Sequence, residues 1–212
     1  YSPMEFIPAE IMVELFPNQQ LLVDYMMDHV YTPDRLASGS ATAILNLRAG
    51  MGKTFVAGGL IPRLGLRTLY VVPKRPLAVQ CVKDLRGCLG RNDGDEELNI
   101  GIYKPNSHAI VSAQHVTVIV IDSAIKQSPA FFASYSFVVL DEVHAYCSKE
   151  RRKIFHMSTW AVLGLSATTE DRADQFDAIA HRELAFDGVI RAEDIPGFTY
   201  EDVVFTAEAR II

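Results

Sequence analysis

Cysteine, long apolar runs and excess positive charge are all scarce in this sequence of 212 residues. The three cysteines show no short pairing motif, which excludes a disulfide-rich scaffold and indicates a reducing, intracellular setting. The apolar run at residues 116–121 is strand-sized, far below the ~20 residues that span a bilayer, so no membrane partner is expected. The net charge of −6 argues against coating nucleic acid by bulk charge.

The chain begins at Tyr1 and not at a methionine, and its first residues do not resemble a signal peptide. We therefore expect a piece that was cut from a longer chain. Hydrophobic residues make up 49% of the sequence and charged residues 22%, as in folded globular proteins. The length is sufficient for one large domain with its own core.

Apolar runs rich in Val, Ile and Leu alternate with helical segments along most of the chain. This alternation predicts an α/β fold with a mostly parallel central sheet that is covered on both faces. The expected strands are residues 42–47, 66–72, 100–103, 116–121, 137–140 and 161–165, and the expected helices include 19–30, one from Pro76 onward, and 172–180. Such sheets bind ligands outside the carboxyl ends of their strands.

The first strand end carries the motif Gly50-Met51-Gly52-Lys53-Thr54, directly before a predicted helix. Glycines let backbone N–H groups approach phosphate oxygens, and the helix adds its positive N-terminal end. In this pattern Lys53 reaches the β- and γ-phosphates and the Thr54 hydroxyl binds Mg²⁺. The full pattern has glycine at position 47, where this chain has leucine. The alternative is an ordinary strand-to-helix turn.

A second strand end, at residues 137–140, runs directly into Asp141 and Glu142. Carboxylates at the end of a buried strand need a cationic partner, and Mg²⁺ on nucleotide phosphates fills that role. We expect Asp141 to hold Mg²⁺, and Glu142 to orient and deprotonate the water that attacks the γ-phosphate of ATP. A solvated acidic turn is the alternative, and the phosphate loop upstream favours the catalytic interpretation.

The order of these motifs resembles that of the first RecA-like domain of a superfamily 2 helicase or translocase. Residues 50–54 resemble motif I, residues 141–144 resemble a DExH-box motif II, and residues 166–168 resemble motif III. Residues 71–80 are similar to motif Ia, and residues 16–20 are similar to the glutamine motif. The resemblance implies a three-layer RecA-like P-loop NTPase domain that uses ATP and Mg²⁺.

The same resemblance implies further roles for single residues. Gln19 would hydrogen-bond the adenine edge, and Phe16, which stands where related proteins often have arginine, could stack on the base. His144 would contact Ser166 and Thr168 and couple the nucleotide state to the bound strand. In the RecA-like order, the strand that ends at residue 166 lies between the phosphate-loop strand and the acidic strand.

Nucleic acid is the partner that the resemblance implies, gripped through its phosphates without reading of bases. Lys74 and Arg75 in motif Ia are the candidate contacts, and a solvated loop is the alternative for them. Ser123 occupies the place of a phosphate-contacting hydroxyl, although Asp122 is an unfavourable neighbour for phosphate. The motif spacing is similar to that of DNA-directed members, including helicases of large DNA viruses, so DNA is expected in preference to RNA.

The motif order also divides the chain. Residues 1–40 form an N-terminal segment with the adenine-recognition helix, residues 41–190 the RecA-like domain, and residues 191–212 an extension towards a second RecA-like domain. Because family members hold ATP between two such domains, we expect an ATP-dependent helicase or nucleoside triphosphatase as the parent, and weak or no hydrolysis by this chain alone. Two alternatives stay open: a P-loop phosphotransferase, and a nucleotide-dependent binding module without motor activity.

Overall fold

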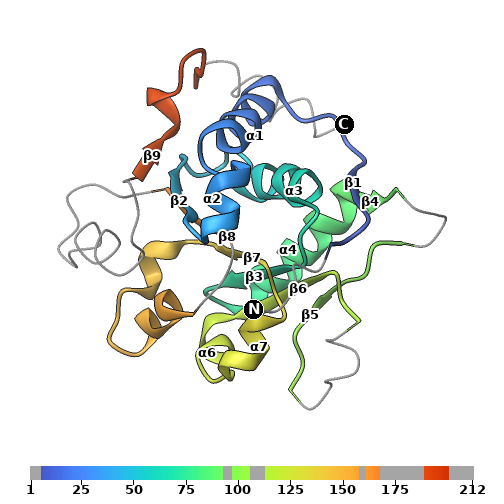
Figure 1. Cartoon of the computed structure of the whole chain (residues 1–212), viewed down its shortest axis with the longest axis vertical. Helices are drawn as coiled ribbons and strands as arrows, with labels where there is room; N and C mark the ends of the chain where they lie inside the picture. The colour runs from blue at the N-terminus through green and yellow to red at the C-terminus, as the bar shows by residue number, and fades with distance from the viewer. Residues whose placement is uncertain (1–5, 93–96, 106–112, 158–160, 168–188, 201–212) are drawn as a thin grey trace.

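A computed structural model describes residues 6–92, 97–105, 113–157, 161–167 and 189–200 of the chain (Figure 1). The predicted helix at 172–180 and the predicted coupling residue Thr168 lie outside these ranges. No helix in the described ranges has the length and apolar character needed to cross a membrane.

A parallel sheet forms the centre of the molecule. Its strands are β2 (Ala41–Asn46), β3 (Thr68–Val72), β5 (Ile100–Ile102), β6 (Val116–Val120), β7 (Phe137–Leu140), β8 (Ala161–Ser166) and β9 (Val189–Arg191). They lie in the order β5-β6-β3-β7-β8-β2-β9, and each neighbouring pair is parallel. The predicted mostly parallel sheet is confirmed, and β8 lies between β2 and β7 as expected.

Helices cover both faces of this sheet. They are α1 (Pro17–His29), α2 (Pro33–Ser38), α3 (Lys53–Leu64), α4 (Arg75–Cys88), α6 (Ile121–Ala124) and α7 (Pro129–Ala133), with 3-10 helices η1 (Val143–Tyr146), η2 (Arg151–His156) and η3 (Ala192–Asp194). One core joins the sheet to α1, α3 and α4, and a second core joins its other face to α6, α7, η1 and η2 (Figure 1). The three-layer arrangement follows because the central strands are buried on both faces.

The central strands consist of apolar, mostly β-branched or aromatic residues, which suits a sheet with no solvated face. All five residues of β3 and all four of β7 are buried. The parallel pairing requires crossover connections, and α3 and α4 provide them between β2, β3 and the next strands. This connectivity brings the carboxyl ends of all the strands to one edge, where the predicted motifs lie.

Two cysteines on α4 belong to the core. Cys81 and Cys88 are buried and form no disulfide. Burial raises the pKa of the Cys88 thiol to about 11 and that of Cys81 even further, so both thiols stay protonated at neutral pH. They act as packing residues.

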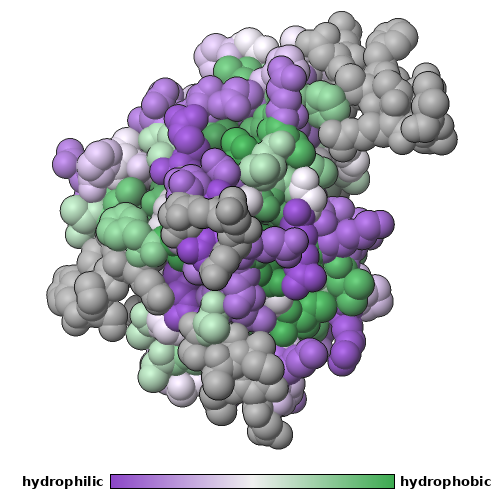
Figure 2. All heavy atoms as spheres, turned by 90° about the vertical axis from the view of Figure 1, so that its right-hand side faces the viewer, coloured by the Kyte–Doolittle hydropathy of each residue, from purple (hydrophilic) through white to green (hydrophobic). Residues whose placement is uncertain are grey.

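A small antiparallel ribbon was not predicted. It pairs β1 (Ala9–Ile11) with β4 (Leu89–Arg91), which directly follows α4. Three-residue strands carry too little alternation for a sequence pattern to reveal them. Figure 2 shows the side of the molecule that carries this ribbon in Figure 1, where hydrophilic and apolar side chains are interspersed.

The N-terminal segment and the last described residues both pack on the sheet domain. Leu22 and Met26 of α1 lie in the same core as β2, and β9 extends the sheet beside β2 across position 190. The predicted boundaries at residues 40 and 190 stay predictions.

Candidate nucleotide-binding site

The phosphate loop connects β2 to α3 and depends on two glycines. Gly50 and Gly52 have φ values of 82° and 77°, in the left-handed region that side chains disfavour. A Cβ on Gly52 would also lie 2.4 Å from Nε2 of Gln19. The loop therefore needs glycine at position 52 for its backbone and for the space beside α1.

Position 47, where the phosphate-loop pattern has glycine, holds a fully buried leucine. Leu47 lies directly after β2, and its backbone N–H donates to the carbonyl of Ser166 on β8 at 2.9 Å. The chain thus stays extended for one residue beyond β2 before it turns into the loop. This departure from the pattern leaves the geometry of the glycines and of α3 intact.

Lys53, at the first position of α3, contacts Glu142 across the site. Its Nζ donates to Oε1 of Glu142, and the two side chains are 12% and 30% exposed. His144 Nδ1 lies 3.5 Å from the other Glu142 carboxylate oxygen and shares a 2.8 Å hydrogen bond with Oγ of Ser166. The structure therefore links the phosphate loop, the acidic strand end and the end of β8 through four side chains.

Glu142 has an unusual backbone conformation. Its φ of 50° and ψ of 48° make it the one non-glycine residue with positive φ in the described part of the chain. Such a conformation costs about 1–2 kcal/mol for a residue with a Cβ, and such outliers concentrate at functional sites. The carboxylate of this residue contacts Lys53 across the site.

The carboxyl group of Asp141 is largely buried. Burial raises its pKa to about 6, and the neighbouring Glu142 raises it too. Lys53 and the backbone N–H of Glu142, which donates to Oδ1 at 3.0 Å, oppose that shift. A cation placed beside Asp141 would return the carboxyl to its ionised form.

Ser166 is buried at the end of β8, in register with Asn46 of β2. Its hydrogen bond to His144 is the contact that the sequence predicted for the coupling residues.

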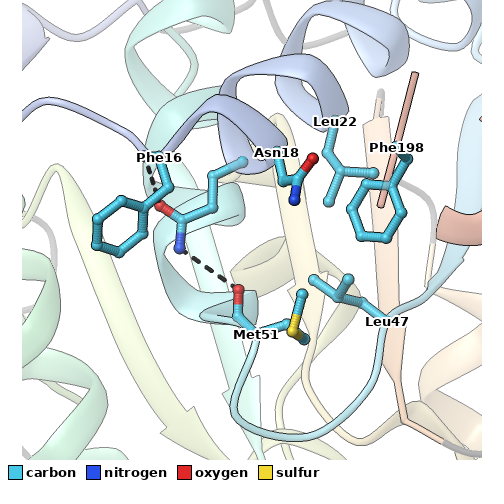
Figure 3. A pocket seen from close by; sticks show the side chains of 7 residues that line it. Phe16, Asn18, Leu22, Leu47, Met51 and Phe198 are labelled. Carbon is cyan, nitrogen blue, oxygen red and sulfur yellow. Dashed lines mark hydrogen bonds between the residues drawn. The ribbon is translucent and has the colours of Figure 1, made fainter. Parts of the chain in front are cut away.

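A pocket lies on the far side of the phosphate loop, at the start of α1. Figure 3 shows side chains converging on it from α1, from the phosphate loop and from the segment after η3. Its lining residues are Phe16, Asn18, Gln19, Leu22, Leu47, Met51 and Phe198. The lining is apolar with a few amide groups, as in sites for flat heteroaromatic bases, and the open space in this structure, about 10 Å³, admits roughly one water molecule.

The Gln19 side chain spans this pocket. Its Oε1 accepts from the backbone N–H of Phe16 at 3.2 Å, and its Nε2 donates weakly to the carbonyl of Met51 at 3.4 Å. Gln19 thus links the start of α1 to the phosphate loop. Its predicted bond to adenine stays a prediction.

The segment from η3 to residue 200 joins the site from far along the chain. Asn18 Nδ2 donates to the carbonyl of Thr199 at 2.6 Å, and the Arg48 guanidinium lies 3.9 Å from the centre of the Tyr200 ring. Phe198 lines the pocket itself. Sequence reasoning missed this contribution because no motif marks it. Its one local signal is the pair of aromatic residues, Phe198 and Tyr200, after a glycine.

The three predicted nucleic-acid contacts follow β3 and β6, which are neighbours in the sheet. Lys74 and Arg75 are exposed at the start of α4, and Ser123 is half-buried on α6. Asp122 beside it is paired with Arg151, whose guanidinium donates to both carboxylate oxygens at 3.0 and 3.3 Å. The pairing offsets the negative charge that made Ser123 a doubtful phosphate contact.

The phosphate loop, the acidic end of β7 and the sheet order together define a P-loop ATPase domain of the RecA-like class. Residues 12–171, about three quarters of the chain, match the family described as the type III restriction enzyme res subunit (ResIII). The chain belongs to this family of helicase-type ATPase domains.

Known proteins with similar sequence or fold include viral and archaeal ones. A protein of African swine fever virus (isolate Pig/Kenya/KEN-50/1950), named as an ATP-dependent RNA helicase, QP509L, is 31% identical over 175 residues. That match covers 80% of this chain, which spans about a third (32%) of the viral protein. The SWI2/SNF2 ATPase core of Sulfolobus solfataricus, solved with dsDNA, has a TM-score of 0.61 at 13% identity, over 85% of this chain and 37% of that one. The UvsW helicase of bacteriophage T4 has a TM-score of 0.56 at 17% identity, over 90% and 64%.

Proposed function

We propose that this chain is the ATP-binding half of a nucleic-acid-dependent ATPase, a DExH-type helicase or translocase. The observation that carries the proposal is the chain of contacts from Lys53 through Glu142 and His144 to Ser166. It joins the residue that would hold the γ-phosphate to the strand end that would report the nucleotide state. An ordinary strand-to-helix turn would not require this series of contacts.

The residues at this site fit an Mg²⁺ ion that is coordinated jointly by the protein and the nucleotide. The described ranges contain no group of three or more His, Cys, Asp or Glu side chains that could hold a metal alone. Mg²⁺ in nucleotide sites is held by one or two protein oxygens and by phosphates, and Thr54 and Asp141 are the oxygens available here. When bound, the ion neutralises charge that develops on the phosphates.

The protein groups have separable tasks in hydrolysis. Lys53 pairs with Glu142 in this structure, and a γ-phosphate would compete for its ammonium group. Glu142, released from that pair, can accept a proton from the attacking water. His144 touches both Glu142 and Ser166, so it can transmit the change to β8.

A second RecA-like domain completes the site in this proposal. The relative from African swine fever virus is about three times as long as the matched region, which leaves room for such a domain there. We therefore expect this chain alone to bind ATP weakly and to turn it over slowly. A source in a large DNA virus and an intracellular location stay predictions. The viral relative supports the first, and three cysteines without a disulfide support the second.

Lys74, Arg75 and Ser123 would grip the phosphates of one strand along the edge of the sheet beside the ATP site. The sequence favours DNA over RNA, whereas the name of the viral relative refers to RNA. Competition between DNA and RNA single strands of the same sequence separates the two.

ATP turnover with and without single-stranded DNA or RNA tests the proposal in the longer parent protein. We expect stimulation by nucleic acid, and its loss in Lys53→Ala because the phosphates lose their ammonium partner. Lys153→Ala is the matched control, since this exposed lysine lies on η2 and pairs with Glu150 at 2.8 Å. Turnover that neither nucleic acid stimulates would favour a phosphotransferase, and unchanged turnover in Lys53→Ala would contradict the site.

A further inference from the structure

Tyr70 carries a buried hydroxyl group that the fold does not use. The residue lies at the centre of β3, and its side chain is fully buried in the core that joins the sheet to α3 and α4. Within the described ranges, no donor or acceptor meets this hydroxyl with hydrogen-bond geometry. Buried polar groups nearly always have a partner, so this exception needs an explanation.

The other fully buried tyrosines show how the fold normally treats such a group. Tyr31 donates to the carbonyl of Val162 at 3.1 Å. Tyr135 donates to Oγ1 of Thr117 at 2.9 Å, and Tyr146 donates to the carbonyl of Val71 at 3.2 Å. Tyr70 alone among these four large buried side chains lacks a bond of this kind.

Its surroundings point to the nucleotide site. Tyr70 pairs with Val139 of β7, two residues before Asp141, and both lie in the core that the sheet shares with α3. Thr54, on the first turn of α3, is the hydrogen-bonding side chain near the Tyr70 hydroxyl, and Asp141 lies within electrostatic range of it. Thr54 and Asp141 are the two groups proposed to hold Mg²⁺.

A phenylalanine would fill the same space in the core without burying a polar group. The hydroxyl gains a partner if a ligand brings one to the site. A hydrated Mg²⁺ held by Thr54 and Asp141 would bring such partners, because Mg²⁺ keeps several of its waters and their O–H groups donate hydrogen bonds.

We propose that Tyr70 is a positioning residue of the Mg²⁺-nucleotide site, whose hydroxyl oxygen accepts a hydrogen bond from a water of the hydrated ion beside Thr54 and Asp141. The inference rests on the proposed function, because it requires that this pair holds Mg²⁺ together with ATP. Partners of this kind around metal ligands typically change metal affinity by about 10–100-fold when they are removed.

The test is Tyr70→Phe in the full-length protein, with Tyr135→Phe as the matched control. A fluorescent ATP analogue is titrated in Mg²⁺ and in EDTA, and the melting temperature is measured without nucleotide. For Tyr70→Phe we expect about tenfold weaker binding in Mg²⁺, unchanged binding in EDTA and no loss of melting temperature. For Tyr135→Phe we expect a lower melting temperature, because a formed hydrogen bond is lost, and unchanged Mg²⁺ dependence.

Other outcomes show whether the Mg²⁺-nucleotide site or only the role of Tyr70 is wrong. If the unmodified chain binds the analogue equally in Mg²⁺ and EDTA, the proposed Mg²⁺-nucleotide site is wrong, and the role of Tyr70 with it. If the unmodified chain needs Mg²⁺ and Tyr70→Phe binds as well as it does, or is weakened equally in both buffers, only the role of Tyr70 is wrong. A Tyr70→Phe chain that melts earlier or fails to fold also contradicts that role, because its hydroxyl would then support the fold.

Discussion

Asp141→Asn should stabilise the nucleotide-free protein while it damages the site. The Asp141 carboxyl has a pKa of about 6 in the folded protein, against an ordinary value of 3.8, with burial as the main cause. The asparagine amide keeps the shape of the side chain and can still accept from the backbone N–H of Glu142, but it carries no charge to desolvate.

The direction with pH follows from the raised pKa. Below pH 4 the carboxyl is protonated in both the folded and the unfolded chain, and its contribution to stability is fully present. As the pH rises through about 6, the folded protein must give up a proton that it holds more tightly than the unfolded chain does, and stability falls. The difference of about two pKa units corresponds to at most about 3 kcal/mol, and partial exposure reduces it.

Urea denaturation of both proteins in EDTA measures this effect. At pH 8 we expect Asp141→Asn to have a higher free energy of unfolding by about 1–3 kcal/mol. The difference should fall to about a third at pH 4.5 and vanish well below pH 3.8, where both states are protonated. A variant that is less stable than the original at pH 8, or a difference that does not change with pH, would refute the claim that burial of the ionised Asp141 carboxylate destabilises the folded protein.

Three further predictions concern other parts of the site. Gly52→Ala should weaken ATP binding and lower the free energy of unfolding by about 1–3 kcal/mol, because residue 52 has a positive φ and a Cβ there would meet Gln19. Gly87→Ala on α4 is the control: a Cβ there has open space, so urea denaturation should show this variant to be neutral or stabilised. Phe198→Ala should weaken binding of an adenine nucleotide about tenfold in a fluorescence titration and leave binding of inorganic triphosphate unchanged, and equal loss for both ligands would contradict a base pocket. Replacing both Lys74 and Arg75 by alanine should weaken binding of single-stranded DNA without loss of ATP binding. The salt dependence of DNA binding should fall by an amount that corresponds to about two phosphate contacts. An unchanged salt dependence would show that Lys74 and Arg75 are solvated side chains that do not contact DNA.

Those parts of the site that were predictable are the ones a short stretch of sequence determines. The glycines and Lys53 sit in one loop between a strand and a helix, and Asp141 follows directly on a buried strand. The position of Ser166 beside them was predicted through the resemblance to RecA-like domains, which supplied the strand order that the sequence alone does not show.

The rest depends on contacts between distant segments. Asn18 meets Thr199 across 181 positions, and no local pattern could pair them. The positive φ of Glu142 is held by its surroundings, since its residue type disfavours that conformation. Tyr70 reads as an ordinary core residue of a β-strand, and only the packed structure shows that its hydroxyl has no bond.

Glu142→Gln tests the central claim most directly, because the amide keeps the size of the carboxylate and removes its capacity as a base. Nucleic-acid-stimulated ATP turnover and ATP binding are measured together in the full-length protein. The account predicts that ATP binding is kept or improved, since Lys53 loses its charged partner, and that turnover falls about 10²–10⁴-fold. Turnover within a factor of two of the original, with binding intact, would contradict Glu142 as the group that activates the attacking water.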